Sequence, residues 1–292
     1  MHQVAPGTKI TSKEQFFASI EDCRIPVLAP GSLSLVSALA ADNQTWRDLT
    51  LILERFPGIA AKLIALVNSA WSAPINPITS LEAACSRLGV NVVKSVSTAL
   101  AVSGSFDTSE CQAFSPEHFW SGSLLVAESA AVLAPLLDGS ARIDLPTART
   151  AGLLHNLGLL FLVDLLPAQT SRVLRMSSDS ELTLNALCKQ ELGIGITDIG
   201  GFLAHKWRLP AALADVMSNY DNGDYQGEHR SLVDVVSISV EIVTALSRDI
   251  NADLRECTRL GQILDAQKVG AVGERLSRAH KNISEVSSTM DW

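Results

Sequence analysis

Residues 151–166 read AGLLHNLGLLFLVDLL, an apolar run that only a few polar side chains interrupt. As a helix, this run would be apolar on nearly every side, which is typical of a segment buried at the centre of a protein. It is shorter than the roughly 20 apolar residues that a membrane-spanning helix needs, and it carries a histidine and an asparagine. We therefore predict one central, buried helix from Ala151 to Leu166 and no membrane insertion.

The segments around this run also carry helix signals. We expect a helix from Val90 to about Ser103, and Ser115-Pro116 has the N-cap and first-turn proline of another long helix. Thr79 and Glu82 form a T-x-x-E capping box. Hydrophobic residues make up 47% of the 292 residues but aromatic residues only 5%, and no segment alternates with the two-residue period of a strand. The sequence predicts an all-α fold.

Charge and cysteine usage limit the classes of function. The formal net charge is −8, which argues against a nucleic-acid-binding protein, since such proteins usually present a basic face. The five cysteines are far apart and include no CxxC pair. Free thiols in the reducing cytoplasm therefore fit better than a disulfide framework or a zinc–thiolate site.

The pair His155-Asn156 is the first candidate site. A His-Asp pair here would offer an imidazole and a carboxylate to a divalent metal, but Asn156 is neutral and lacks the charge that holds a hard cation. We predict no metal ligand and no catalytic residue. Two interpretations remain, namely a hydrogen-bonded histidine of the core and a vestigial pocket.

Asn68-Ser69 and Trp71 form the second candidate. Asn68 ends an expected helix, where asparagine is a good left-handed C-cap and a serine can hydrogen-bond the turn. Trp71 has the size of a core or interface anchor. The alternative hypothesis is that these residues contact a binding partner.

A stripe of apolar residues near the C-terminus is the third candidate. Val269, Val272, Leu276 and Ile283 recur at helical spacing. Either this helix packs its stripe onto the body of the protein, or the stripe binds a partner or a second copy of the chain.

Several of these stretches, in this order and spacing, resemble the HDOD family, the HD-related output domains of bacterial signalling proteins. The matching stretches are Ile25–Leu28, Arg55–Leu63, Leu66–Ala70, Ile78–Ala84, Arg87–Gly89, Phe119–Ala127, Ala151–Gly158 and Trp207–Pro210. The resemblance implies the helical bundle of HD-type metal phosphohydrolases in a family that is generally non-catalytic.

The resemblance also implies where the metal ligands of an HD enzyme would lie. The histidine that follows the Phe-Trp pair falls at Gly122, the His-Asp pair at His155-Asn156 and the final aspartate near Val240. A further histidine position falls near Thr197-Asp198, and a paired-histidine position falls at Asn219-Tyr220. Only His155 remains as a ligand, so the resemblance implies a degenerate site without HD-type hydrolysis or a cofactor.

The expected architecture is a single compact globule with an N-terminal arm (1–20), an HDOD-like helical domain (21–248) and a C-terminal helical extension (249–292). Because that domain fills nearly the whole chain, the resemblance implies a stand-alone cytoplasmic output domain. It would act through protein partners in a signalling pathway, and it could form a homodimer. The alternatives are a small ligand or nucleotide bound in the former active-site pocket, and residual phosphohydrolase activity.

Overall fold

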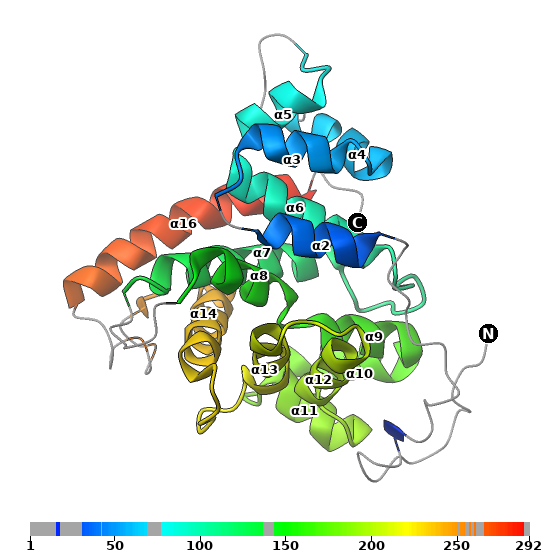
Figure 1. The fold of residues 1–292 in the computed structure, drawn as a ribbon. Helices are drawn as coiled ribbons and strands as arrows, with labels where there is room; N and C mark the ends of the chain where they lie inside the picture. Colours follow the sequence, from blue (N-terminus) through cyan, green and yellow to red (C-terminus); the bar gives the residue numbers. More distant parts are fainter. Residues whose placement is uncertain are drawn as a thin grey trace.

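The computed structural model describes residues 16–17, 31–41, 43–68, 77–136, 143–249, 252–254, 257, 260 and 266–288. Within these ranges every regular element is a helix, as predicted (Figure 1). None of the described helices is both long enough and apolar enough to cross a membrane. Of the expected N-terminal arm, the described part is Phe16, which is fully buried, and Phe17, whose ring stacks on that of Phe202 at 4.8 Å.

Five helices with a core of their own form the N-terminal lobe. They are α2 (Ser32–Ala40), α3 (Trp46–Leu53), α4 (Pro57–Val67), α5 (Leu81–Leu88) and α6 (Val90–Ser103). Leu49, Leu53, Leu63 and Cys85 are completely buried in this core. Figure 1 shows α3, α4 and α5 gathered at one end of the molecule, with α2 and α6 between them and the rest.

The remaining helices surround a second and larger core, and we call them the body. They are α7 (Pro116–Leu133), α8 (Leu145–Leu154), α9 (Leu157–Leu165), α10 (Pro167–Ser177), α11 (Leu184–Leu192), α12 (Ile196–Lys206), α13 (Ala211–Asn219), α14 (Arg230–Arg248) and α16 (Ala266–Ser288). Helix α7 contacts α8, α14 and α16, and α9 contacts α12. The body therefore has α7 and α9 near its centre.

Local helix signals were mostly reliable. Helix α6 has the predicted bounds, and the Ser115 hydroxyl accepts a hydrogen bond from the His118 backbone N–H at the start of α7. The predicted capping box at Thr79 was wrong by one residue, because α5 begins at Leu81 and Ser80 accepts from the Ala83 N–H. Thr79 and Ser80 are adjacent and both can cap a helix, so the sequence pattern alone did not show which of them is the N-cap.

The prediction of one helix from Ala151 to Leu166 was wrong. The chain forms two helices, α8 and α9, and His155 and Asn156 occupy the turn between them. A Cβ atom on Gly152 would lie 2.9 Å from the Ala127 Cα of α7. A Cβ on Gly158 would overlap the Ile196 carbonyl oxygen of α12. The two glycines thus let α8 and α9 approach different neighbours closely, and the turn between them gives each helix its own direction.

The C-terminal stripe packs onto the body. Val269, Val272 and Leu276 of α16 are at most 3% exposed, and Ile283 is half-buried against the same core. These side chains are therefore part of the chain's own core rather than an exposed partner surface. An ion-pair network supports this packing, because Glu128 of α7 binds Arg149 of α8 and lies 3.7 Å from the Arg275 guanidinium of α16.

Candidate functional site

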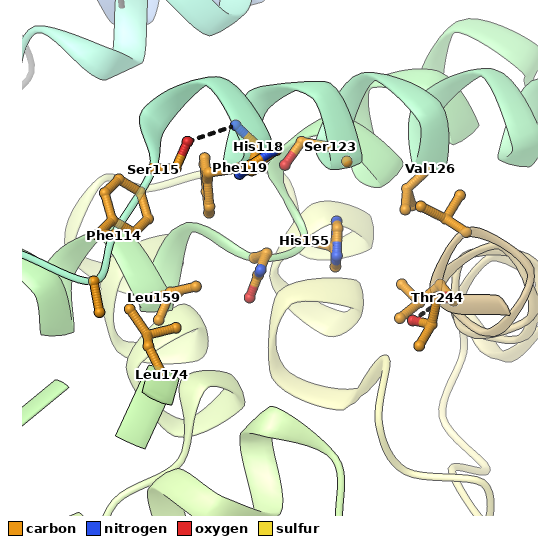
Figure 2. A pocket seen from close by; sticks show the side chains of 15 residues that line it. Phe114, Ser115, His118, Phe119, Ser123, Val126, His155, Leu159, Leu174 and Thr244 are labelled. Carbon is orange, nitrogen blue, oxygen red and sulfur yellow. Dashed lines mark hydrogen bonds between the residues drawn. The ribbon is translucent and has the colours of Figure 1, made fainter. Parts of the chain in front are cut away.

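A pocket of about 330 Å³ opens between helices α7, α10 and α14 and the turn that joins α8 to α9. Its lining includes His155 and Asn156, the pair that the sequence singled out. Figure 2 shows His155 among the lining side chains, with Phe114 and Leu174 towards one end and Val126 and Thr244 towards the other. The fifteen lining residues are Ala113, Phe114, Ser115, His118, Phe119, Gly122, Ser123, Val126, His155, Asn156, Leu159, Leu174, Val240, Val243 and Thr244.

His155 is a buried, neutral imidazole held in a fixed orientation. The residue is 5% exposed, and its Nδ1 lies 2.7 Å from the carbonyl oxygen of Gly152. A carbonyl only accepts hydrogen bonds, so Nδ1 carries the proton. Burial lowers the pKa of His155 to about 4, although the bond to Gly152 opposes this shift. The ring also packs edge-to-face against Tyr220, with the centroids 4.8 Å apart.

Asn156 is half-buried beside it. The Tyr220 hydroxyl donates a hydrogen bond of 3.3 Å to the Asn156 Oδ1. Burial raises the pKa of Tyr220, so its phenol keeps the proton that it donates. Tyr220 therefore orients both residues of the pair, one through its ring face and the other through its hydroxyl.

Four of the positions that the resemblance assigns to HD metal ligands line this pocket. Gly122, His155, Asn156 and Val240 all line it. These side chains do not fit a divalent ion, because a hydrogen atom, an amide and an isopropyl group stand at three of these four positions. No group of three or more His, Cys, Asp or Glu residues in the described part of the chain could hold a metal.

The two other positions carried over from the resemblance have different surroundings. Tyr220 contacts His155 as described, whereas Thr197 and Asp198 do not line the pocket. The Asp198 carboxylate accepts a hydrogen bond from the Gly195 N–H, which begins α12. The Thr197 N–H donates to the Asn185 side chain. Both residues at this position are thus used for local structure.

Asn68 lies in the other lobe and holds two segments together. Its side-chain NH₂ donates to the carbonyl oxygens of Ile64 and Ile78, at 2.8 and 2.7 Å, and its Oδ1 accepts from the Ile78 N–H at 2.7 Å. The expected left-handed C-cap was wrong, because Asn68 has a φ of −97°. Ser69 and Trp71 lie outside the described residues.

Comparison with protein families identifies the fold. The sequence profile of the HDOD domain matches residues 25–222, which is more than half of the chain. The chain belongs to the HDOD domain family. Comparison with curated proteins gives no match.

Solved structures of similar fold include other HDOD and HD-like proteins. A candidate signal transduction protein from Marinobacter aquaeolei VT8 is 22% identical, with a TM-score of 0.76 over 95% of this chain and 61% of that one. This chain thus spans less than two thirds of that relative. An HDOD domain protein of unknown function from Geobacter sulfurreducens is 18% identical, with a TM-score of 0.72 over 96% of this chain and 97% of that one. A candidate phosphohydrolase from Shewanella amazonensis SB2B is 21% identical, with a TM-score of 0.70 over 94% and 97% of the two chains.

Sequence reasoning missed several residues of the HDOD pocket. Ser115 was identified only as a helix cap, and Phe114, His118 and Thr244 carried no signal of a site. They come from the start of α7 and from α14, and only the fold brings them next to His155. Ser115 and His118 precede Gly122 by about two helical turns and one helical turn, at the start of the same helix. This spacing is the sequence signal that could have identified them, because it places them near Gly122 along α7.

Proposed function

We propose that this HDOD chain is a non-catalytic signal-transduction module that acts by binding a protein partner. The observation that carries the proposal is the composition of the pocket at the HD ligand positions. Gly122, Asn156 and Val240 line it at positions where the resemblance places a histidine and two aspartates of an HD enzyme. The description of the Marinobacter relative as a candidate signal transduction protein supports the signalling part.

Loss of hydrolysis follows from the chemistry of these side chains. Activation of water by a metal needs an ion that several ligands hold while one position stays open. A single neutral imidazole beside an amide binds a divalent ion weakly, and Nδ1 of His155 already donates to Gly152. On this proposal, the pocket lies where an HD enzyme has its site and lacks that site's metal chemistry.

A metal-loading experiment tests this half of the proposal. The full chain is treated with a chelator, reloaded with Mn²⁺ and assayed for bound metal and for hydrolysis of bis(p-nitrophenyl) phosphate. We expect neither stoichiometric metal nor hydrolysis. The positive control is the triple variant Gly122→His, Asn156→Asp, Val240→Asp, since a Cβ on Gly122 meets no atom within 4 Å. A wild-type chain that keeps one metal ion and cleaves the ester would contradict the proposal.

A binding experiment tests the other half. The tagged full chain is used to capture partners in cells of its source organism, and each candidate is purified and titrated against the chain. We expect saturable binding of a distinct protein. Light scattering on the chain alone shows whether it forms a homodimer that would compete with binding of a distinct protein. If no purified candidate binds, the partner part of the proposal fails while the loss of hydrolysis can still stand.

We also place the protein in the cytoplasm. The supporting observation is that Cys85, Cys111 and Cys188 are free and buried. Burial raises the pKa of the Cys188 thiol to about 12, which leaves it protonated and unreactive.

A further inference from the structure

The pocket presents a hydrogen-bond acceptor that no described residue of the protein uses. Because Nδ1 of His155 donates to the Gly152 carbonyl, Nε2 of the neutral ring carries a lone pair and no proton. Nε2 has no hydrogen-bond partner among the residues that the structure describes. His155 is 5% exposed and lines the pocket, so a water or a bound molecule in the pocket can reach this nitrogen.

The neighbouring residue offers a donor. The Asn156 Oδ1 accepts from the Tyr220 hydroxyl, which leaves the two N–H groups of the amide without a partner in the described part of the chain. Two consecutive residues thus present an acceptor and a donor to one pocket. Tyr220 fixes both, and fixed groups lose little freedom when a ligand binds.

The rest of the pocket is more apolar than polar. Its lining, as far as the structure describes it, contains no Asp, Glu, Lys or Arg. Phe114, Phe119, Leu159, Leu174 and Val243 supply apolar walls. A phosphate or carboxylate would lose much of its hydration there, and no Lys or Arg of this lining could pair with it; besides His155, only His118 of the lining could supply a positive charge. The volume of about 330 Å³ is at the lower end of the range for small-molecule sites.

We propose that this pocket binds a small, uncharged molecule that carries an N–H next to a C=O, as a cyclic amide does. The N–H donates to Nε2 of His155, and the C=O accepts from the amide of Asn156. Apolar atoms of the ring pack against the phenylalanine and leucine walls. This site does not depend on the protein partner proposed above, and its test needs only the purified full chain.

Four probes of similar size separate the interactions. The first is 2-pyridone, which has both the N–H and the C=O. N-methyl-2-pyridone lacks the donor, toluene lacks both groups, and 6-hydroxynicotinate adds a carboxylate. Binding is measured by saturation-transfer NMR and by the shift of the thermal unfolding midpoint. We expect 2-pyridone to bind saturably and each of the other three to bind at least tenfold more weakly.

Matched variants place the binding in the pocket. Gly122→Leu adds a side chain in open space on the pocket wall, and the chain should stay folded and lose the 2-pyridone signal. Gly270→Leu makes the same change in α16, where a Cβ also meets no atom within 4 Å, and should leave binding unchanged. Asn156→Asp removes the donor with little change in shape, and should weaken 2-pyridone at least tenfold.

Three results would overturn the proposal. The first is no response of the wild-type chain to 2-pyridone at millimolar concentration. The second is equal binding of toluene or 6-hydroxynicotinate. The third is 2-pyridone binding that persists in the Gly122→Leu chain. None of them bears on the metal or partner experiments, so the two proposals fail separately.

Discussion

Asn68 and Asn156 each stand where one helix ends, yet their amides have different surroundings. Asn68 is exposed, and three hydrogen bonds of 2.7–2.8 Å tie its side chain to the backbone of Ile64 and Ile78. Asn156 is half-buried, and its side chain has one long bond of 3.3 Å, from Tyr220. The exposed Asn68 thus uses its side chain to hold the backbone, whereas the more buried Asn156 keeps hydrogen-bonding groups that the described residues do not use.

This difference separates structural from binding residues better than exposure does. A polar group whose donors and acceptors are all used adds stability and offers little to a ligand. A polar group that is enclosed and only partly paired is a cost of folding, which a bound molecule can offset. By this criterion we expect Asn68 to serve the fold, and we propose the pocket beside Asn156 as the functional region.

The largest expected effect comes from the glycine that sets the turn at Asn156. Gly158→Ala would place a methyl group on the Ile196 carbonyl oxygen and force α9 away from α12. We expect a loss of about 4 kcal/mol or more, which is in the range of severe core disruption. Urea unfolding measures it.

Gly122→Ala is the control for this loss. Gly122 lies within α7, and a Cβ there meets no atom within 4 Å. Alanine favours a helix over glycine by about 1 kcal/mol, so this chain should be as stable as the wild type or slightly more so. If both variants lose stability equally, close packing at Gly158 does not hold the turn.

The contrast also shows what the sequence could predict. The bounds of α6 and the cap at Ser115 were correct, because residues within one turn determine them. The break at His155-Asn156 was missed, because it depends on α7 and α12 backbones that lie about 25 and 40 residues away. In the same way, Asn68 binds Ile78, which is ten residues further along the chain. The prediction of a left-handed cap considered only the neighbouring residues and therefore missed this contact.

The site was predictable only in part. The sequence singled out His155-Asn156, and the family resemblance placed Gly122 and Val240 at the positions that line the same pocket. The free state of Nε2 was not predictable, because it depends on which backbone carbonyl the other ring nitrogen meets. The burial of Val272 and Leu276 required knowledge of α7, since a stripe at helical spacing suits a core and a partner equally.

The second-largest expected effect is a dependence of the unfolding free energy on pH. It arises from His155 in the turn, and Asn68 does not contribute to it. Burial lowers the pKa of His155 from 6.5 to about 4. Below pH 6.5 the unfolded chain therefore binds a proton at His155 more readily than the folded chain does. Stability falls as the pH drops from about 6.5 towards 4, and this residue has no effect at higher pH.

The size of this loss reaches about 3 kcal/mol, at roughly 1.4 kcal/mol for each pKa unit. His155→Gln should remove it, so the difference in unfolding free energy between the two chains should vary with pH across this window. Asn68→Ala is the control and should show the slope of the wild type. A constant difference between the His155→Gln chain and the wild type from pH 7 to 4 would mean that the imidazole ionises freely in the fold.

A smaller loss is expected when Asn68 is replaced. Asn68→Ala breaks three hydrogen bonds, but the site is exposed and water takes over the backbone groups. We expect a cost of about 1–2 kcal/mol in urea unfolding. Asn68→Asp keeps the acceptor for the Ile78 N–H but turns a carboxylate oxygen towards the carbonyl oxygens of Ile64 and Ile78 at the end of α4, so its cost should be at least that of the alanine variant.

The smallest expected effect on stability is that of replacing Asn156. This variant gives the most direct test of the difference between Asn68 and Asn156. Asn156→Ala removes one long hydrogen bond and relieves an amide whose donors are unpaired, so we expect a change of less than about 1 kcal/mol. The two alanine variants should therefore reverse their order between assays, with Asn68→Ala less stable and Asn156→Ala weaker in 2-pyridone binding. Equal losses of stability would show that both asparagines serve the fold alike, and that exposure alone distinguishes them.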